Sequence, residues 1–281
     1  MKIALALAAA WILSGCSAMR IAYDNADTFL RWRATSYLDV HGDDSDELDA
    51  AIDEFLSWHR AQALPKYALL AEDGAKRVAA GLSPGDLVWG FDSLVAQARE
   101  SVRAAAVRIA PLLDRLSEEQ VKHIEKRFAE DNRKFAREFL RGSEKERRKR
   151  RENRNVERME DWVGGLSQQQ AERVKQYSER APIFSEHRDR DRKRLQAEFL
   201  SIVRAREAKK RLPDAAANWD LGRDVEYVGA NEALFKEFSA MLLDVERMLA
   251  PEQRAKAVAR LRAFAEDFTA LSRSGAENRA R

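Results

Sequence analysis

The chain has 281 residues, of which 35% are charged, but its formal net charge is only +3. A balance this close to neutral argues against nucleic-acid binding through bulk positive charge. The chain contains only 12 glycines and 6 prolines and is rich in alanine, leucine, glutamate, arginine and lysine, so we expect an all-α fold.

The N-terminus has the order of a secretory signal. Lys2 precedes an apolar run over residues 3–13, which is shorter than the roughly 20 residues that a membrane-spanning helix needs. Leu13, Ser14 and Gly15 then precede Cys16, and this sequence resembles the bacterial lipobox. The resemblance implies cleavage before Cys16 and acylation of its thiol and of its new amino group. We therefore expect a signal peptide at residues 1–15 and a lipidated anchor with a short tether at residues 16–23.

Cys16 is the only cysteine, which excludes an intramolecular disulfide and a thiolate metal cluster. Acyl chains contribute about 0.8 kcal/mol per buried CH₂, so several of them give stable membrane attachment. The alternative is a buried free cysteine that happens to follow a signal peptide.

Lipoproteins that stay in the inner membrane tend to carry aspartate after the cysteine, whereas this chain has Ser17. The resemblance therefore implies the outer membrane, periplasmic face, more than the inner membrane.

The remaining sequence predicts about eight amphipathic helices, arranged as an array or bundle over residues 24–272, and a polar tail over 273–281. On the first helix, one face is predicted to hold Phe29, Leu30, Ala34, Tyr37 and Leu38. The second helix has the clearest apolar stripe, formed by Leu48, Ala51, Ile52, Phe55, Leu56 and His59. His59 is therefore predicted to lie on a buried face.

Acidic residues are dense between residues 39 and 54. A calcium loop of the EF-hand type requires glycine at its sixth position and a closing glutamate, and this spacing is absent. We interpret the acids as residues at a helix N-terminus, where the helix dipole favours negative charge.

A weak repeat precedes four predicted helix starts. Its copies are Leu82-Ser83-Pro84-Gly85-Asp86, Leu116-Ser117-Glu118-Glu119-Gln120, Leu166-Ser167-Gln168-Gln169-Gln170 and Leu249-Ala250-Pro251-Glu252-Gln253. The second and third copies have the serine and glutamine of a capping box. Pro84 and Pro251 fit the first helical turn.

Longer patterns fill the rest of the chain. A stripe on the helix that follows Pro84 is formed by Leu87, Phe91, Leu94, Val95, Ala98, Val102, Ile109 and Leu112. Residues 144–154 contain almost no apolar side chain and predict a solvated helical segment or a linker. Leu212, Pro213 and Asp214 predict a turn.

We find no motif for catalysis, cofactor binding or metal binding. His41, His59, His123 and His187 lack the spacing of helical zinc ligands, and no phosphate loop, dinucleotide fingerprint or nucleophile elbow is present. His59 is interpreted as a hydrogen-bonded core residue, and a catalytic base is the alternative. We expect a protein that is not an enzyme, with an enzyme of unrecognised site as the last alternative.

Two basic runs, residues 147–151 and 188–194, are interleaved with acids such as Glu144, Glu146, Asp189 and Asp191. We interpret both as salt-bridged, solvated helix faces. The alternative is contact of Arg147, Arg148, Arg150 and Arg151 with anionic lipid headgroups or with the phosphates of lipopolysaccharide.

Several local sequences together resemble an uncharacterised family of proteobacterial lipoproteins. They are the lipobox, residues 20–27, Trp58-His59-Arg60, Leu64-Pro65-Lys66-Tyr67 and residues 116–120. The resemblance covers nearly the whole chain and implies one helical unit, but no active site.

A narrower resemblance links the Leu-Ser-x-x-Gln copies to the Leu-Thr-x-x-Gln motif of periplasmic Spy-type chaperones, which bind unfolded clients. Capping chemistry alone also explains this motif. We therefore expect a non-enzymatic, lipid-anchored envelope protein that binds a partner or has a structural role. A membrane-tethered chaperone is the alternative.

The first prediction concerns the lipobox. Cys16→Ser removes the thiol that accepts the lipid, so the chain should accumulate as an unprocessed precursor without palmitate. Metabolic labelling followed by electrophoresis measures both properties. Palmitate on the Cys16→Ser chain would contradict lipidation at this residue.

Overall fold

The computed structural model describes residues 19–277, which contain the eleven α-helices α2 to α12, two π-helical segments and no strand. The all-α fold is therefore confirmed, with more helices than the eight expected. Residues 19–24 are helical. The other elements are α2 (Ala26–Leu38), α3 (Asp43–Trp58), η1 (His59–Ala63), α4 (Leu64–Ala80), α5 (Pro84–Leu113), α6 (Glu118–Phe135), η2 (Ala136–Leu140), α7 (Glu144–Val163), α8 (Gln168–Arg180), α9 (Ser185–Arg204), α10 (Ala208–Ala217), α11 (Val225–Arg247) and α12 (Pro251–Glu277).

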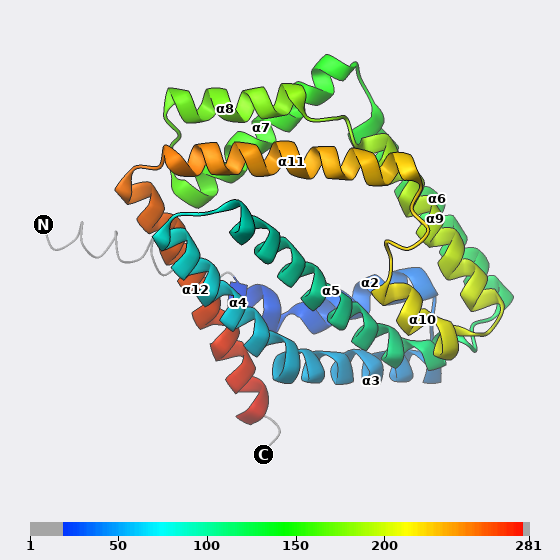
Figure 1. Ribbon diagram of the computed structural model, residues 1–281. Helices are drawn as coiled ribbons and strands as arrows, with labels where there is room; N and C mark the ends of the chain where they lie inside the picture. Colours follow the sequence, from blue (N-terminus) through cyan, green and yellow to red (C-terminus); the bar gives the residue numbers. More distant parts are fainter. Residues whose placement is uncertain (1–18, 278–281) are drawn as a thin grey trace, which may run out of the picture.

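The helices form an open frame (Figure 1). Helices α7, α8 and α11 form one side, and α3 and α10 lie on the opposite side. The pair α6 and α9 joins these two sides at one edge, and the pair α4 and α12 lies at the other edge. Helix α5 crosses between the sides, so part of its surface faces the inside of the frame.

The frame contains two clusters of buried apolar side chains. The larger joins α2, α3, α5, α6, α9 and α10 around residues such as Leu48, Leu112, Ile124 and Ile202. The smaller lies between α8 and α11, around Val174, Met241 and Val245. Each cluster stabilises the helices around it by removing apolar surface from water.

Both predicted capping boxes are confirmed. In the second copy of the repeat, Ser117 Oγ accepts from the Gln120 backbone N–H (3.2 Å), and Gln120 Oε1 accepts from the Ser117 N–H (2.8 Å). Ser167 and Gln170 make the same pair of bonds at the start of α8. Further capping boxes join Ser83 to Asp86 and Ser143 to Glu146. These bonds satisfy backbone donors that have no partner inside the helix.

The third and fourth copies of the repeat also bond to each other. Buried Gln170 donates from Nε2 to the Met248 carbonyl (3.0 Å), while Gln253 donates from Nε2 to the Gly165 carbonyl (2.8 Å). The two side-chain amides meet directly, with 2.8 Å between Gln170 Nε2 and Gln253 Oε1. This junction ties the start of α8 to the start of α12.

Two predicted apolar stripes include exposed residues. Leu30 and Ala34 of α2 pack on the larger core and Leu38 is buried, but Phe29 is exposed. On α5, Phe91 and Leu94 are exposed as well. Periodicity identifies residues that share a helix face, whereas burial requires a neighbouring element on that face.

The turn predicted at residues 212–214 is wrong, because Pro213 lies inside α10. The Asp114 carboxylate at the end of α5 accepts from the backbone N–H groups of Ala208 (2.5 Å) and Lys209 (3.2 Å). These bonds cap α10 from another part of the chain, which no local pattern reveals. Residues 144–154 are helical within α7, as one of the two predicted alternatives.

The second prediction tests the glutamine junction. Gln170→Ala removes the bonds to Met248 and Gln253 and leaves buried polar groups without partners, which costs about 1–3 kcal/mol of unfolding free energy. Urea denaturation monitored by circular dichroism measures the loss. The control is Gln169→Ala on the exposed side of the same turn, which should change the stability little. Equal stabilities of the two variants would contradict the role of the junction.

Candidate functional site

The candidate site is a largely apolar groove lined mainly by α7 and α11. Its volume is about 520 Å³. Twelve of its fifteen lining residues are apolar: Val78, Leu82, Leu94, Met159, Trp162, Val163, Phe238, Met241, Leu242, Val245, Leu249 and Ala257. We call this site the α5–α11 groove: five of its lining residues come from α11, five from α7 and one, Leu94, from α5.

Exposed apolar side chains continue from this groove along the two helices that give it its name. Leu94 of α5 is 61% exposed and Phe238 of α11 is 38% exposed, and both line the groove. One turn before Leu94, the exposed Phe91 contacts Phe235 of α11, with 5.1 Å between ring centroids. The open side of α5 therefore presents apolar surface to water next to the groove.

Three polar residues complete the lining. Buried Glu246 pairs with Arg254 and accepts from the Leu82 backbone N–H (3.2 Å). Asn155 donates to Ser178 Oγ (3.4 Å). Arg158 is exposed and makes no hydrogen bond or ion pair with any residue from 19 to 277. The groove thus combines apolar walls with a guanidinium group that is available to a ligand.

His59 lies at the first residue of the π-helical segment η1, within an aromatic cluster. The rings of Tyr23, Phe55, Trp58 and Tyr67 lie 5.5–6.3 Å from its ring, between centroids. Its Nδ1 lies 2.7 Å from the Tyr23 hydroxyl. These contacts connect residues 19–24 to α3 and α4.

The ionisation of this pair follows from its burial. Burial raises the pKa of Tyr23 to about 12, so its hydroxyl keeps its proton. Burial, and secondarily the positive charge of Arg60, lowers the pKa of His59 and so favours its neutral ring. We therefore assign Tyr23 as the donor and His59 Nδ1 as the acceptor. His59 is absent from the lining of the α5–α11 groove, so the structure does not bring the two features together.

The first basic run bonds mainly to backbone groups at the end of α8 and in the segment that follows it. Arg151 donates to the carbonyls of Ser178 (2.6 Å), Ala181 (2.7 Å) and Pro182 (2.7 Å). Arg148 donates to the Ala181 carbonyl (2.9 Å). In the same run, Arg147 pairs with Glu186 and Arg150 donates to the Arg141 carbonyl. These arginines stabilise the fold, and their contact with anionic headgroups stays a prediction.

The second basic run forms the predicted ion pairs. Asp189 accepts from Lys193 (2.6 Å), and Asp191 contacts Arg194 (2.8 Å) and Arg223 (3.1 Å). Both aspartates are buried rather than solvated. The run therefore contributes to the packing of α9 against the segment before α11.

Three potential metal ligands converge near the start of α11. His187, Asp224 and Glu226 place ligand atoms within 4.8 Å of one another. The Arg190 guanidinium lies among them, at 2.9 Å from His187 Nδ1 and 3.0 Å from Glu226. Asp224 also caps α11 by accepting from the Tyr227 N–H (2.6 Å). Since Arg190 already supplies the positive charge, these residues do not fit a metal site well.

The acidic residues near the start of α3 are placed as predicted. Asp43, Asp44 and Asp46 lie in its first turn. Further along the helix, Asp49 and Asp53 both pair with Arg31 of α2 (2.8 and 2.5 Å). The first three acids therefore stabilise the start of α3, and the other two attach α3 to α2.

The lipobox residues Leu13, Ser14 and Gly15, and Cys16 itself, lie outside the described residues, so their role stays a prediction. Among the helices of residues 19–277, none is both long and apolar enough to cross a membrane.

Comparison with known proteins gives one match. A family model described as a family of unknown function (DUF6279) matches residues 36–218. No curated protein and no solved structure matches the chain. The matched range contains His59 and the α5 and α7 walls of the groove, whereas α11 and α12 lie beyond it.

The third prediction concerns His59 and pH. An unfolded histidine titrates near pH 6.5, and the folded chain has a lower pKa at His59. Below about pH 6.5 the unfolded chain therefore binds more protons, so this residue's contribution to stability is present above that pH and is lost on acidification towards the lowered pKa. In His59→Gln, the loss of unfolding free energy between pH 7.5 and 5 should be smaller than in the unchanged chain.

Urea titrations across this pH range measure the difference. His41→Gln, at an exposed residue, is the matched control and should keep the full pH dependence. A His59→Gln chain with the same pH dependence as the His41→Gln chain would contradict the assignment.

Proposed function

The chain belongs to a family of unknown function (DUF6279), and from its own residues we propose that it is a lipid-anchored protein of the bacterial cell envelope that binds an apolar group in the α5–α11 groove. The binding is non-enzymatic. The anchor is the acylated Cys16, and the outer membrane, periplasmic face, is the proposed location because Ser17 follows the cysteine. A second envelope protein or a lipid-like molecule is the partner class for the groove.

The observation that carries the binding proposal is the composition of the groove. A volume of about 520 Å³ lies within the range of roughly 300–1,000 Å³ typical of ligand sites. Its walls are largely apolar, and Leu94 and Phe238 extend the apolar surface outward. Contiguous exposed apolar surface on a protein commonly marks an interaction site, because its burial on binding is favourable.

Arg158 indicates which apolar groups fit best. Its charge lies at the groove without a partner among the described residues, so a negative group attached to an apolar ligand would pair with it. The groove thus favours an anionic amphiphile over a purely apolar molecule.

The residues also support a binding role over catalysis. Glu246 is the titratable acid in the groove lining, and its carboxylate is already bonded to Arg254 and Leu82. His59, the alternative catalytic base, bonds to Tyr23 within its aromatic cluster. Acid–base chemistry needs a group within hydrogen-bond reach of the ligand, and these side chains are engaged in the fold.

A membrane-tethered chaperone for unfolded clients is the second candidate. Exposed apolar residues along α5 favour this candidate, because they provide apolar surface beyond the groove to which an unfolded chain can bind. They include Val88, Phe91, Val102 and Val107. The Leu-Ser-x-x-Gln resemblance adds less support, since Ser117, Gln120, Ser167 and Gln170 are all engaged in capping. An aggregation assay with a thermally unfolded client discriminates the two: no suppression at a stoichiometric ratio would discard the chaperone.

The fourth prediction tests the groove. The chain from Ser17 onward contains every described residue and can be titrated with anilinonaphthalene sulfonate, an anionic apolar fluorophore. Leu94→Asp with Phe238→Asp places negative charge on the apolar walls, so the affinity should fall about tenfold or more, equivalent to about 1.4 kcal/mol. Both side chains are partly exposed, so the fold should tolerate the change.

The matched control is Leu221→Asp, which changes an equally apolar and exposed side chain outside the groove. It should leave the affinity unchanged. Equal affinities in the double variant and in the control would overturn the proposed groove.

A further inference from the structure

Residues 19–24 and α2 together, which we call the first helical segment, carry an apolar face that no described element covers. Ile21, Phe29 and Trp32 are 61%, 59% and 63% exposed. Hydrogen bonds from Asn25 N to Ile21 O and from Phe29 N to Asn25 O, both 3.2 Å, continue the helical path between residues 19–24 and α2. Residues four and three positions apart therefore share one face, and the Phe29 and Trp32 rings contact each other at 6.0 Å between centroids.

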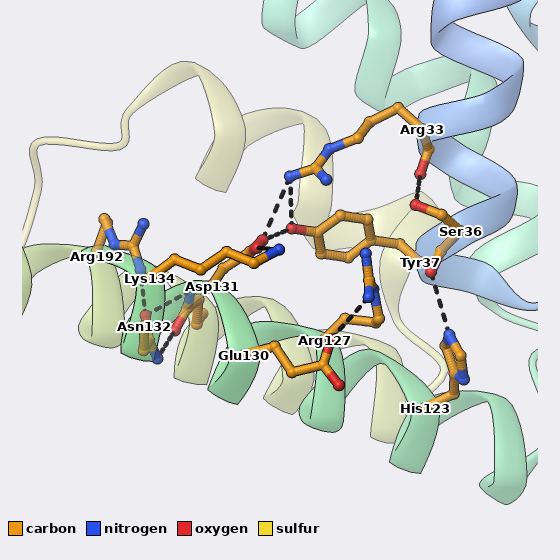
Figure 2. A network of polar contacts seen from close by, with 11 residues as sticks. Arg33, Ser36, Tyr37, His123, Arg127, Glu130, Asp131, Asn132, Lys134 and Arg192 are labelled. Carbon is orange, nitrogen blue, oxygen red and sulfur yellow. Dashed lines mark hydrogen bonds and ion pairs between the residues drawn. The ribbon is translucent and has the colours of Figure 1, made fainter. Parts of the chain in front are cut away.

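The opposite face of this segment is fixed to the body. Its Tyr23 hydroxyl bonds to His59, and the hydroxyl of Tyr37 bonds to the Asp131 carboxylate of α6. Figure 2 shows how Arg33 also reaches Asp131, at 3.3 Å, and how His123 contacts the Ser36 carbonyl, at 3.1 Å. The exposed face cannot turn inward without breaking these bonds.

A further contact fixes the N-terminal end. Arg20 Nε donates to Asp267 Oδ1 of α12 (2.6 Å), and Asp267 is buried. Breaking this pair would leave the buried Asp267 carboxylate without its partner, which is unfavourable. The position of Ile21 relative to the body is thereby determined.

Chain length places this face near the membrane. Cys16 precedes Ile21 by five residues, and five residues span at most about 18 Å even when fully extended. If the acyl chains of Cys16 lie in a bilayer, Ile21 is held next to the headgroups. Trp32 lies eleven residues further, about 16 Å along a helix.

We propose that Ile21, Phe29 and Trp32 form a bilayer-contact face that inserts into the headgroup region of the leaflet that holds Cys16. The proposal rests on the lipid anchor of the proposed function. Tryptophan and phenylalanine suit this region because their rings are large and partly or wholly apolar. The contact fixes the orientation of the whole domain on the membrane, beyond tethering it.

The charges near the face determine which lipids it needs. Asp24, beside the face, lies 3.8 Å from Arg60, and Arg31 and Arg33 are paired with carboxylates of α3 and α6. The face therefore offers apolar contact and little net charge, so zwitterionic phosphatidylcholine suffices. This requirement separates it from the basic run of α7, for which anionic lipid would be needed.

The test uses the lipidated full chain in phosphatidylcholine vesicles. Acylation blocks the thiol of Cys16, so Asn25→Cys introduces a unique reactive thiol in the middle of the face without removing an apolar residue. An environment-sensitive fluorophore at residue 25 should shift to shorter wavelength and be quenched by nitroxide-labelled lipid. The matched control is Gln169→Cys, an exposed position on α8 at the far side of the frame from α2 (Figure 1), where neither effect should occur.

Phe29→Ser with Trp32→Ser, in the Asn25→Cys chain, should abolish the quenching although the protein still floats with the vesicles. Flotation without quenching at residue 25 in the otherwise unchanged chain would overturn the bilayer-contact face but keep the lipid anchor, and would leave a second copy or another protein to cover the face. Loss of flotation of the lipidated chain would overturn both proposals.

Discussion

The frame depends on hydrogen-bonding groups at the ends of its helices. Each α-helix leaves backbone donors at its start and acceptors at its end, and these must find partners wherever two helices meet. Gln120 and Gln170 satisfy their own helix starts with one amide atom and bond to a carbonyl of another segment, Asp39 and Met248 respectively, with the other. One side chain thus caps the start of its own helix and attaches that helix to another segment.

Attachment at the helix ends permits an open arrangement. Helix α5 packs along α3 and α10 on one side, and its other side, with Val88, Phe91 and Leu94, remains uncovered. The candidate groove lies beside this uncovered side, because Leu94 of α5 lines it together with residues of α7 and α11. The exposed face of the first helical segment has a similar origin. Hydrogen bonds and an ion pair fix the segment to the body, and its apolar residues Ile21, Phe29 and Trp32 do not pack on another element.

Local chemistry was sufficient to predict the helix starts and the buried stripe of α3, since a capping serine and glutamine lie three residues apart and a stripe lies within one helix. The groove was not predictable in this way. Its residues come from five helices, and the same periodicity that places the buried Ile52 on a stripe also places the exposed Phe29, Phe91 and Leu94 on stripes. Whether a stripe is covered depends on the positions of distant elements, as does the start of α10, which is capped by Asp114 from almost a hundred residues earlier. An apolar residue that belongs to a helical stripe but is exposed in the structure therefore helps to identify a binding surface.

The ion pair between Arg20 and Asp267 connects residues that are 247 positions apart. A chain that is synthesised, or exported, from its N-terminus cannot close this pair until α12 has emerged. During nearly the whole passage of the chain, Arg20 therefore lacks this partner, whereas the bond of Tyr23 to His59 can form much earlier. The N-terminal end of residues 19–24 therefore acquires this contact only once Asp267 of α12 is available.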